Sequence, residues 1–248
     1  MSARGAARGL LLPGLLATVG FAILIGLGFW QLERRIWKEQ LIARVEARTR
    51  APVQPMPVET DWPKVDAARD EYWVVTASGT FRHDREALVH TVLSEPRGRF
   101  SGVGYWVLTP LELANGAIVI VNRGFVSADH RNPTTRRAGQ VEGPVKVTGL
   151  LRMPEAPNSF TPNNDPARGE WFVRDPQAIA AAFGLARVAP FMIDADAAPN
   201  PGGLPQGGET RLRFPNNHLG YALTWFGLAA ALAGVFGAFA WQRLAGAR

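Results

Sequence analysis

Residues 9–32, GLLLPGLLATVGFAILIGLGFWQL, contain no charged side chain, and neither do residues 219–241, LGYALTWFGLAAALAGVFGAFAW. An α-helix rises about 1.5 Å per residue, so the first stretch reaches about 36 Å, enough to cross a hydrocarbon core of about 30 Å. The chain between the two stretches is too short to surround both with an apolar shell. We therefore predict a transmembrane helix at each end of the chain.

A cleaved signal peptide is the alternative for the first stretch, because Arg4 and Arg8 form a basic region ahead of it. Signal peptides have apolar runs of only about 7 to 15 residues, which is shorter than this one. The run also ends with Phe29 and Trp30, followed by the charged residues 33–35. Aromatic residues before a polar stop are typical of a membrane interface, which favours an uncleaved anchor.

The distribution of charge argues against a nucleic-acid partner. The net charge is +6, but the two tails, residues 1–8 and 242–248, contribute four of these charges and contain no acid. The central region is therefore nearly neutral and needs no polyanion.

Basic tails favour a multi-pass protein with both termini in the cytoplasm and the central domain in the periplasm. Six basic residues just after the first stretch oppose this orientation, so the charge count alone leaves it undecided; they are Arg34, Arg35, Lys38, Arg44, Arg48 and Arg50. Long loops are translocated largely regardless of charge. The first span begins near residue 9, which leaves no room for a mitochondrial transit peptide, so we expect a bacterial inner membrane.

Residues 33–218 are predicted to form the extracytoplasmic domain. Apolar residues recur at helical spacing through 33–50, which predicts a helical stalk that continues the first span. Residues 72–194 are predicted to form a β-rich core, because short runs rich in Val, Ile, Thr, Tyr and Trp alternate with turn residues. The predicted strands are 72–81, 87–93, 104–111, 118–126 and 145–151, with weaker ones at 170–174 and 190–193 beside a short helix at 176–183.

Asn115-Gly116 predicts a hairpin between two of these strands, in the form of a type I′ turn. Residues 196–208 repeat Pro and Gly and are predicted to be a flexible linker to the second span. Together these features predict an α+β membrane protein, in which two transmembrane helices flank a β-rich domain built as an antiparallel sheet or a small barrel.

Few residues offer catalytic or metal-binding chemistry. The chain has no cysteine, which excludes disulfides, thiolate metal sites and covalent c-type haem attachment. His83, His90 and His130 lie beside charged or turn-forming residues, without the spacing of a metal site, and no GxSxG motif occurs. We therefore expect no catalytic residue and no enzyme activity.

His218 is the exception, because it follows Pro215-Asn216-Asn217, which is suited to begin a helix. The positive end of the helix dipole favours a neutral imidazole, the form that ligates iron. Helical spacing places His218, Tyr221 and Trp225 on one face, which suits a flat apolar macrocycle. The alternative is that these residues are ordinary membrane-interface anchors. Gly220, Gly227 and Gly234 are predicted to pack against Ala22-x-x-x-Gly26 of the first span.

Four motifs in order resemble the Surfeit locus protein 1 family: residues 28–32 (GFWQL), 104–111 (GYWVLTPL), 121–126 (VNRGFV) and 217–226 (NHLGYALTWF). The resemblance implies an assembly factor for haem-copper cytochrome c oxidase that binds haem a as transient cargo and assists its insertion into the large oxidase subunit. It implies that His218 is the axial ligand of the haem iron and that Trp225 accompanies it, and we expect Tyr221 to line the porphyrin. The expected partners are the large oxidase subunit, the machinery of haem A synthesis and the membrane.

Two other functions remain open from the sequence. The chain could be a scaffold that stabilises oxidase assembly intermediates without haem, or a membrane-tethered enzyme whose residues converge only in the fold. For the cargo function, we consider that Arg34, Arg35 or Arg123 pairs with the haem propionates, because guanidinium matches a carboxylate.

Overall fold

The computed structural model describes residues 9–245, which form two compact units. One unit is a helix pair, made of the chain up to Arg44 and from Arg213 onward, and the other is a domain formed by Val45–Leu212. The predicted cytoplasmic tail 1–8 and residues 246–248 of the second predicted tail lie outside the described residues.

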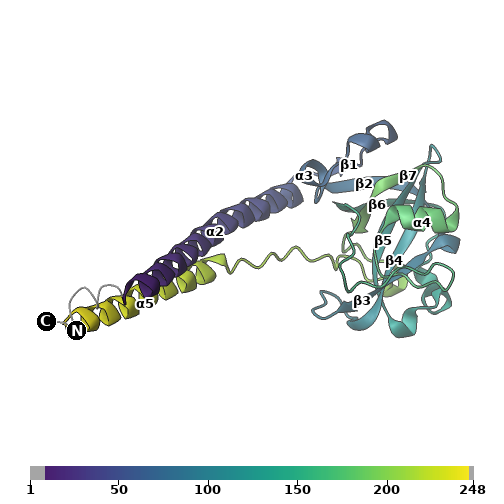
Figure 1. The fold of residues 1–248 in the computed structure, drawn as a ribbon. Helices are drawn as coiled ribbons and strands as arrows, with labels where there is room; N and C mark the ends of the chain where they lie inside the picture. Colours follow the sequence, from purple (N-terminus) through teal and green to yellow (C-terminus); the bar gives the residue numbers. More distant parts are fainter. Residues whose placement is uncertain (1–8, 246–248) are drawn as a thin grey trace. The chain divides into compact units, whose positions relative to one another are not determined.

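The helix pair contains α2 (Leu11–Arg50) and α5 (His218–Ala245), which are coloured purple and yellow in Figure 1. Among the described residues, these two helices are long and apolar enough to cross a membrane. α2 has 40 residues and continues without a break through the predicted stalk at 33–50. At about 1.5 Å per residue it is about 60 Å long, twice the thickness of a hydrocarbon core.

Contacts between α2 and α5 run in antiparallel order. A Cβ added at Gly14 would meet Phe236, one at Gly20 would meet Leu232, and one at Gly28 would overlap the ring of Phe226. The predicted glycine contact is wrong: Cβ atoms at Gly26, Gly220, Gly227 and Gly234 would all meet open space. The small residues that do face the other helix on α5 are the buried Ala222 and Ala229.

The domain is built on one sheet with short helices around it (Figure 1). Its strands are β1 (Gln54–Pro55), β2 (Val74–Phe81), β3 (Ala87–Leu93), β4 (Gly102–Leu113), β5 (Ile118–Ser127), β6 (Pro144–Arg152) and β7 (Val188–Ala195). Its α-helices are α3 (Ala67–Asp70) and α4 (Pro176–Phe183), and its 3₁₀ helices are η1 (Glu59–Lys64), η2 (His83–Arg85), η3 (Ala128–His130), η4 (Pro133–Gly139) and η5 (Pro201–Gly203).

Five of the strands close into a small barrel. The strand order is β1-β2-β6-β7-β5-β4-β3, and β2 also pairs with β4, which joins β2, β6, β7, β5 and β4 in a ring. The predicted fold class is confirmed: two apolar helices flank a β-rich domain. The sheet is mixed, however, because β5 pairs with β7 in parallel, as β1 does with β2.

Side chains alternate between two apolar clusters along β5. Val119 and Val121 face a cluster with Phe191 and Trp62, whereas Ile118 and Ile120 face a second cluster beneath α4. Because both faces are covered, β5 is buried almost throughout. This explains why its first four residues, 118–121 (IVIV), are continuously apolar rather than alternating.

Three local predictions differ from the structure, and the first two concern the hairpin turn and a weak strand. Asn115-Gly116 does form the β4–β5 hairpin, but only Gly116 has a positive φ (+78°), so the turn is a type I turn with a glycine bulge rather than type I′. The predicted strand 170–174 is reduced to isolated bridges, one of which joins Trp171 to Val89.

Residues 196–208 do not form a free linker. Leu204 and Gln206 are buried, and Gln206 exchanges two backbone hydrogen bonds with Phe125 of β5. The side chain of Glu209 follows them and accepts hydrogen bonds from the backbone amides of Arg97 and Gly98. This segment is therefore packed on the barrel by specific polar contacts that its Pro and Gly content does not reveal.

Candidate functional site

His218 is the first residue of α5 and forms a hydrogen bond with a side chain of α2. Its Nδ1 lies 2.7 Å from Oε1 of Gln31, which is buried and 9% exposed. An amide oxygen only accepts hydrogen bonds, so Nδ1 carries the ring proton and donates it to Gln31. The lone pair of the neutral ring is therefore on Nε2, the nitrogen available to a metal.

Tyr221 and Trp225 follow His218 on α5 but differ in environment. Tyr221 is 57% exposed, whereas Trp225 is partly buried. The indole Nε1 of Trp225 is fully enclosed and has no hydrogen-bond partner. Buried indole N–H groups usually find an acceptor, so this donor is an exception.

Gln31 is the residue of this site that the sequence analysis did not single out. It belongs to the GFWQL motif, but its role depends on a partner 187 positions away. Histidines that ligate metals typically donate their second ring N–H to an oxygen acceptor, which fixes the tautomer and the ring orientation. Gln31 provides that acceptor.

The three arginines considered for the propionates belong to two different units. Arg34 and Arg35 lie on α2, where Arg34 stacks over Trp37 and Arg35 pairs with Glu39 at 2.7 Å. Arg123 lies in the other unit, buried in the barrel domain. Within the described residues, no group of three His, Cys, Asp or Glu side chains is arranged to hold a metal ion.

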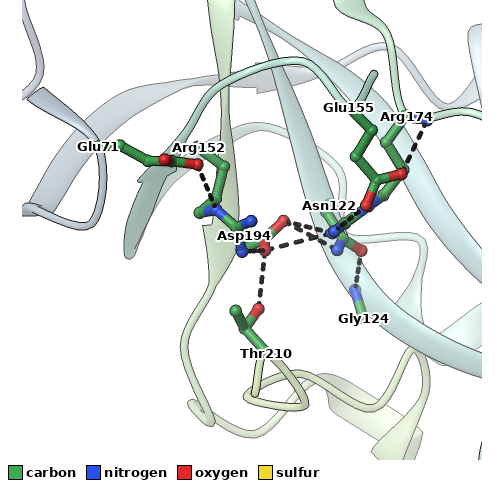
Figure 2. Close-up of polar contacts among 8 residues, drawn as sticks. All are labelled: Glu71, Asn122, Gly124, Arg152, Glu155, Arg174, Asp194 and Thr210. Carbon is green, nitrogen blue, oxygen red and sulfur yellow. Dashed lines mark hydrogen bonds and ion pairs between the residues drawn. The ribbon is translucent and has the colours of Figure 1, made fainter. Parts of the chain in front are cut away.

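The barrel has its own polar centre at Asp194 of β7, shown in Figure 2. Its carboxylate accepts hydrogen bonds from Arg174 (3.1 Å), Asn122 (2.9 Å) and Thr210 (2.8 Å), and from Arg152 at 3.4 Å. Two outer acids complete the network, because Glu71 pairs with Arg152 and Glu155 with Arg174. The network ties β5, β6 and β7 to the segment that leads to α5.

Two arginines and three carboxylates make up this network. Burial by itself would lower the pKa of Arg174, but attraction to Asp194 and Glu155 outweighs it, and the pKa lies above its ordinary value. Both carboxylate oxygens of Asp194 are engaged, so this network connects the elements of the fold.

Three consecutive residues of the VNRGFV motif have different structural tasks. Asn122 donates to Asp194 and accepts from the amide of Gly124 (Figure 2). Arg123 points to a separate cluster around Glu86. Gly124 has φ +124°, and a Cβ there would lie 2.0 Å from the carbonyl oxygen of Gln206, so the segment packs directly on its backbone.

Glu86 lies between two buried arginines. Its carboxylate pairs with Arg136 at 2.7 Å and with Arg123 at 3.3 Å. Burial on its own would raise the pKa of Glu86, but His83, Arg136 and Arg123 surround the carboxylate and lower its pKa to about 2. Glu86 is therefore ionised at neutral pH, and two guanidinium groups share one carboxylate.

Comparison with known proteins gives a consistent result. The SURF1 family model matches residues 18–230. Surfeit locus protein 1 of Mus musculus is 39% identical over 220 residues, which cover 85% of this chain and 70% of the mouse protein. The human protein of that name is 38% identical over 217 residues (83% and 70%), and the SURF1-like protein of Drosophila melanogaster is 37% identical over 235 residues (90% and 74%).

The structure defines a class of protein in which two apolar helices flank a small β-barrel domain. In this class a histidine, here His218, is the first residue of the second helix. The matched region runs from within α2 into α5 and includes all four motifs. The chain belongs to the SURF1 family. Membership of this family implies a role in the assembly of cytochrome c oxidase, and the two apolar helices indicate association with a membrane.

Proposed function

We propose that this chain binds haem a at the head of α5 and assists its insertion into the large subunit of cytochrome c oxidase, without catalytic turnover. The observation that carries this proposal is the hydrogen bond from His218 Nδ1 to Gln31, because it leaves Nε2 as the free nitrogen. His218 ligates the iron through Nε2, and Gln31 holds the ring in place.

The neighbouring residues fit a porphyrin. The exposed ring of Tyr221 and the half-buried indole of Trp225 offer aromatic surface on the same side of α5 as His218. The haem is cargo, so it supplies no chemistry to a reaction of this chain.

A carrier must also release its cargo. A single protein ligand on iron with an exchangeable sixth position would give the moderate affinity that a carrier needs.

The proposal includes a location. The chain is a multi-pass protein of a bacterial inner membrane, with both tails in the cytoplasm and the barrel domain in the periplasm. The basic tails support this orientation through the positive-inside rule. The large oxidase subunit and the machinery of haem A synthesis are the proposed partners.

The test is to co-produce the wild type and His218→Ala with haem A synthesis, purify both in detergent, and record absorption spectra with haem extraction. We expect haem a in the wild type and its loss or a shifted Soret band in His218→Ala. His130→Ala is the matched control, since it removes an imidazole that contacts only the barrel domain. A wild type that purifies without haem a would replace the carrier by the scaffold function.

A further inference from the structure

A pocket of about 280 Å³ opens on the barrel domain beside the Glu86 cluster. Three charged residues line it: Arg123 of β5, Lys146 of β6 and Asp196, which follows β7. Much of the remaining wall is apolar and includes Phe81, Val145 and Pro199. The pocket belongs to the domain alone and has no residue in common with the proposed haem site.

Arg123 is 2% exposed, yet its hydrogen bonds are incomplete. It donates to Glu86, and its Nη2 donates to the carbonyl oxygen of Gly139, but its Nε has no partner. The guanidinium also stacks over Phe81, with Cζ 4.7 Å from the ring centroid. A buried guanidinium with an unsatisfied N–H is costly, and an additional acceptor would stabilise it.

The charge around the pocket does not balance. Arg123, Arg136 and Lys146 are cationic, whereas Glu86 and Asp196 are anionic, which leaves one positive charge in excess. His83 also lies in this cluster, with its Nε2 2.9 Å from the carbonyl oxygen of Val141. Burial lowers the pKa of Arg123 to about 10 despite the attraction of Glu86, which is consistent with a shortage of negative charge.

We propose that this pocket binds a small monocarboxylate, whose carboxylate lies toward Lys146 and Arg123 and whose apolar part packs on Phe81, Val145 and Pro199. A single excess positive charge matches a monoanion, and Asp196 opposes a more highly charged group such as phosphate. The apolar wall adds affinity for a molecule that is more than a bare anion.

Benzoate, its neutral isostere benzamide and inorganic phosphate are suitable probes. Their binding to the full chain in nonionic detergent is measured by ligand-observed NMR at pH 7 and low salt. We expect benzoate to bind with a dissociation constant in the millimolar range, as is ordinary for so small a ligand. Benzamide and phosphate should each bind at least about tenfold more weakly, since one lacks the charge and the other the apolar body.

Two exposed residues allow the charge to be changed in either direction without disturbing the core. Lys146→Gln should weaken benzoate binding by about three- to fivefold, and Asp196→Asn should strengthen it by a similar factor. Lys64→Gln is the control, because Lys64 is equally exposed but pairs with Asp61 on η1. The proposal is overturned if benzoate does not bind, if benzamide or phosphate binds as well, or if the two variants fail to change affinity in opposite directions.

Discussion

Replacing Gly124 by alanine tests whether the barrel depends on the segment that precedes α5. The added Cβ would lie 2.0 Å from the carbonyl oxygen of Gln206, and the backbone at Gly124 has φ +124°, which alanine rarely adopts. The segment must move away, which breaks the two backbone hydrogen bonds between Phe125 and Gln206, each 2.8 Å long.

The expected loss of stability follows from these contacts. Each lost hydrogen bond costs about 1 kcal/mol, and the positive φ adds about 1 to 2 kcal/mol, so the free energy of unfolding should fall by about 3 to 4 kcal/mol. For a domain of this size that corresponds to a decrease in Tm of about 10 °C. Gly116→Ala is the matched control, since its φ is +78° but a Cβ would meet nothing nearer than 3.5 Å.

The assay is thermal unfolding of the full chain in detergent, followed by near-ultraviolet circular dichroism. Gly116→Ala should lose only the conformational part, about 1 to 2 kcal/mol. Amide hydrogen exchange at Phe125 and Gln206 gives a second readout, because both amides are bonded to each other's carbonyl groups in the wild type. Equal destabilisation by the two substitutions, or unchanged protection of Gln206 in Gly124→Ala, would refute the close-contact argument.

Three further predictions concern other sites. Gln31→Leu should leave the helix pair folded but remove the hydrogen-bond partner of His218 Nδ1. In absorption spectra, haem a occupancy should fall at least about tenfold and the Soret band should broaden. Unchanged spectra would show that Gln31 is not part of the site. Asp194→Asn should lower the free energy of unfolding by about 3 kcal/mol, because two partly buried arginines lose the carboxylate that they share. The exposed control Asp84→Asn should change this free energy little in denaturant titrations. The pKa of Glu86 is about 2 in the folded chain and 4.5 in its ordinary state. Ionised Glu86 therefore stabilises the fold fully above about pH 4.5, and this contribution of up to about 3 kcal/mol is lost as the pH falls toward 2. A Glu86→Gln chain whose free energy of unfolding shows the same acid dependence would contradict this prediction.

Local sequence signals predicted much of the fold. The helix at 176–183 has the bounds expected, because Asp175 caps its first turn and Gly184 ends it with φ +64°. The strands at 87–93 and 118–126 were located by composition and turn residues alone, and they agree with β3 and β5 to within one residue. These signals act over a few residues, so they can be read directly.

Long-range partners could not be predicted in the same way. Barrel closure depends on β2 meeting β4, and the parallel pairing of β5 with β7 depends on a connection through β6 and α4. Helical spacing placed Gly220, Gly227 and Gly234 on one face but did not indicate which face meets α2. His218 was found from its position at a helix start, whereas Gln31 was not, because no local pattern links residues so distant in sequence.

The close packing of residues 204–210 on β5 and β7 sets an order for folding during synthesis. Thr210, the last residue to reach Asp194, precedes the first residue of α5 by only eight positions. The barrel cannot satisfy its central carboxylate, or the backbone of Phe125, until nearly all of the domain has been made. The contacts that complete the barrel therefore become available only when the chain has been made almost as far as the start of α5.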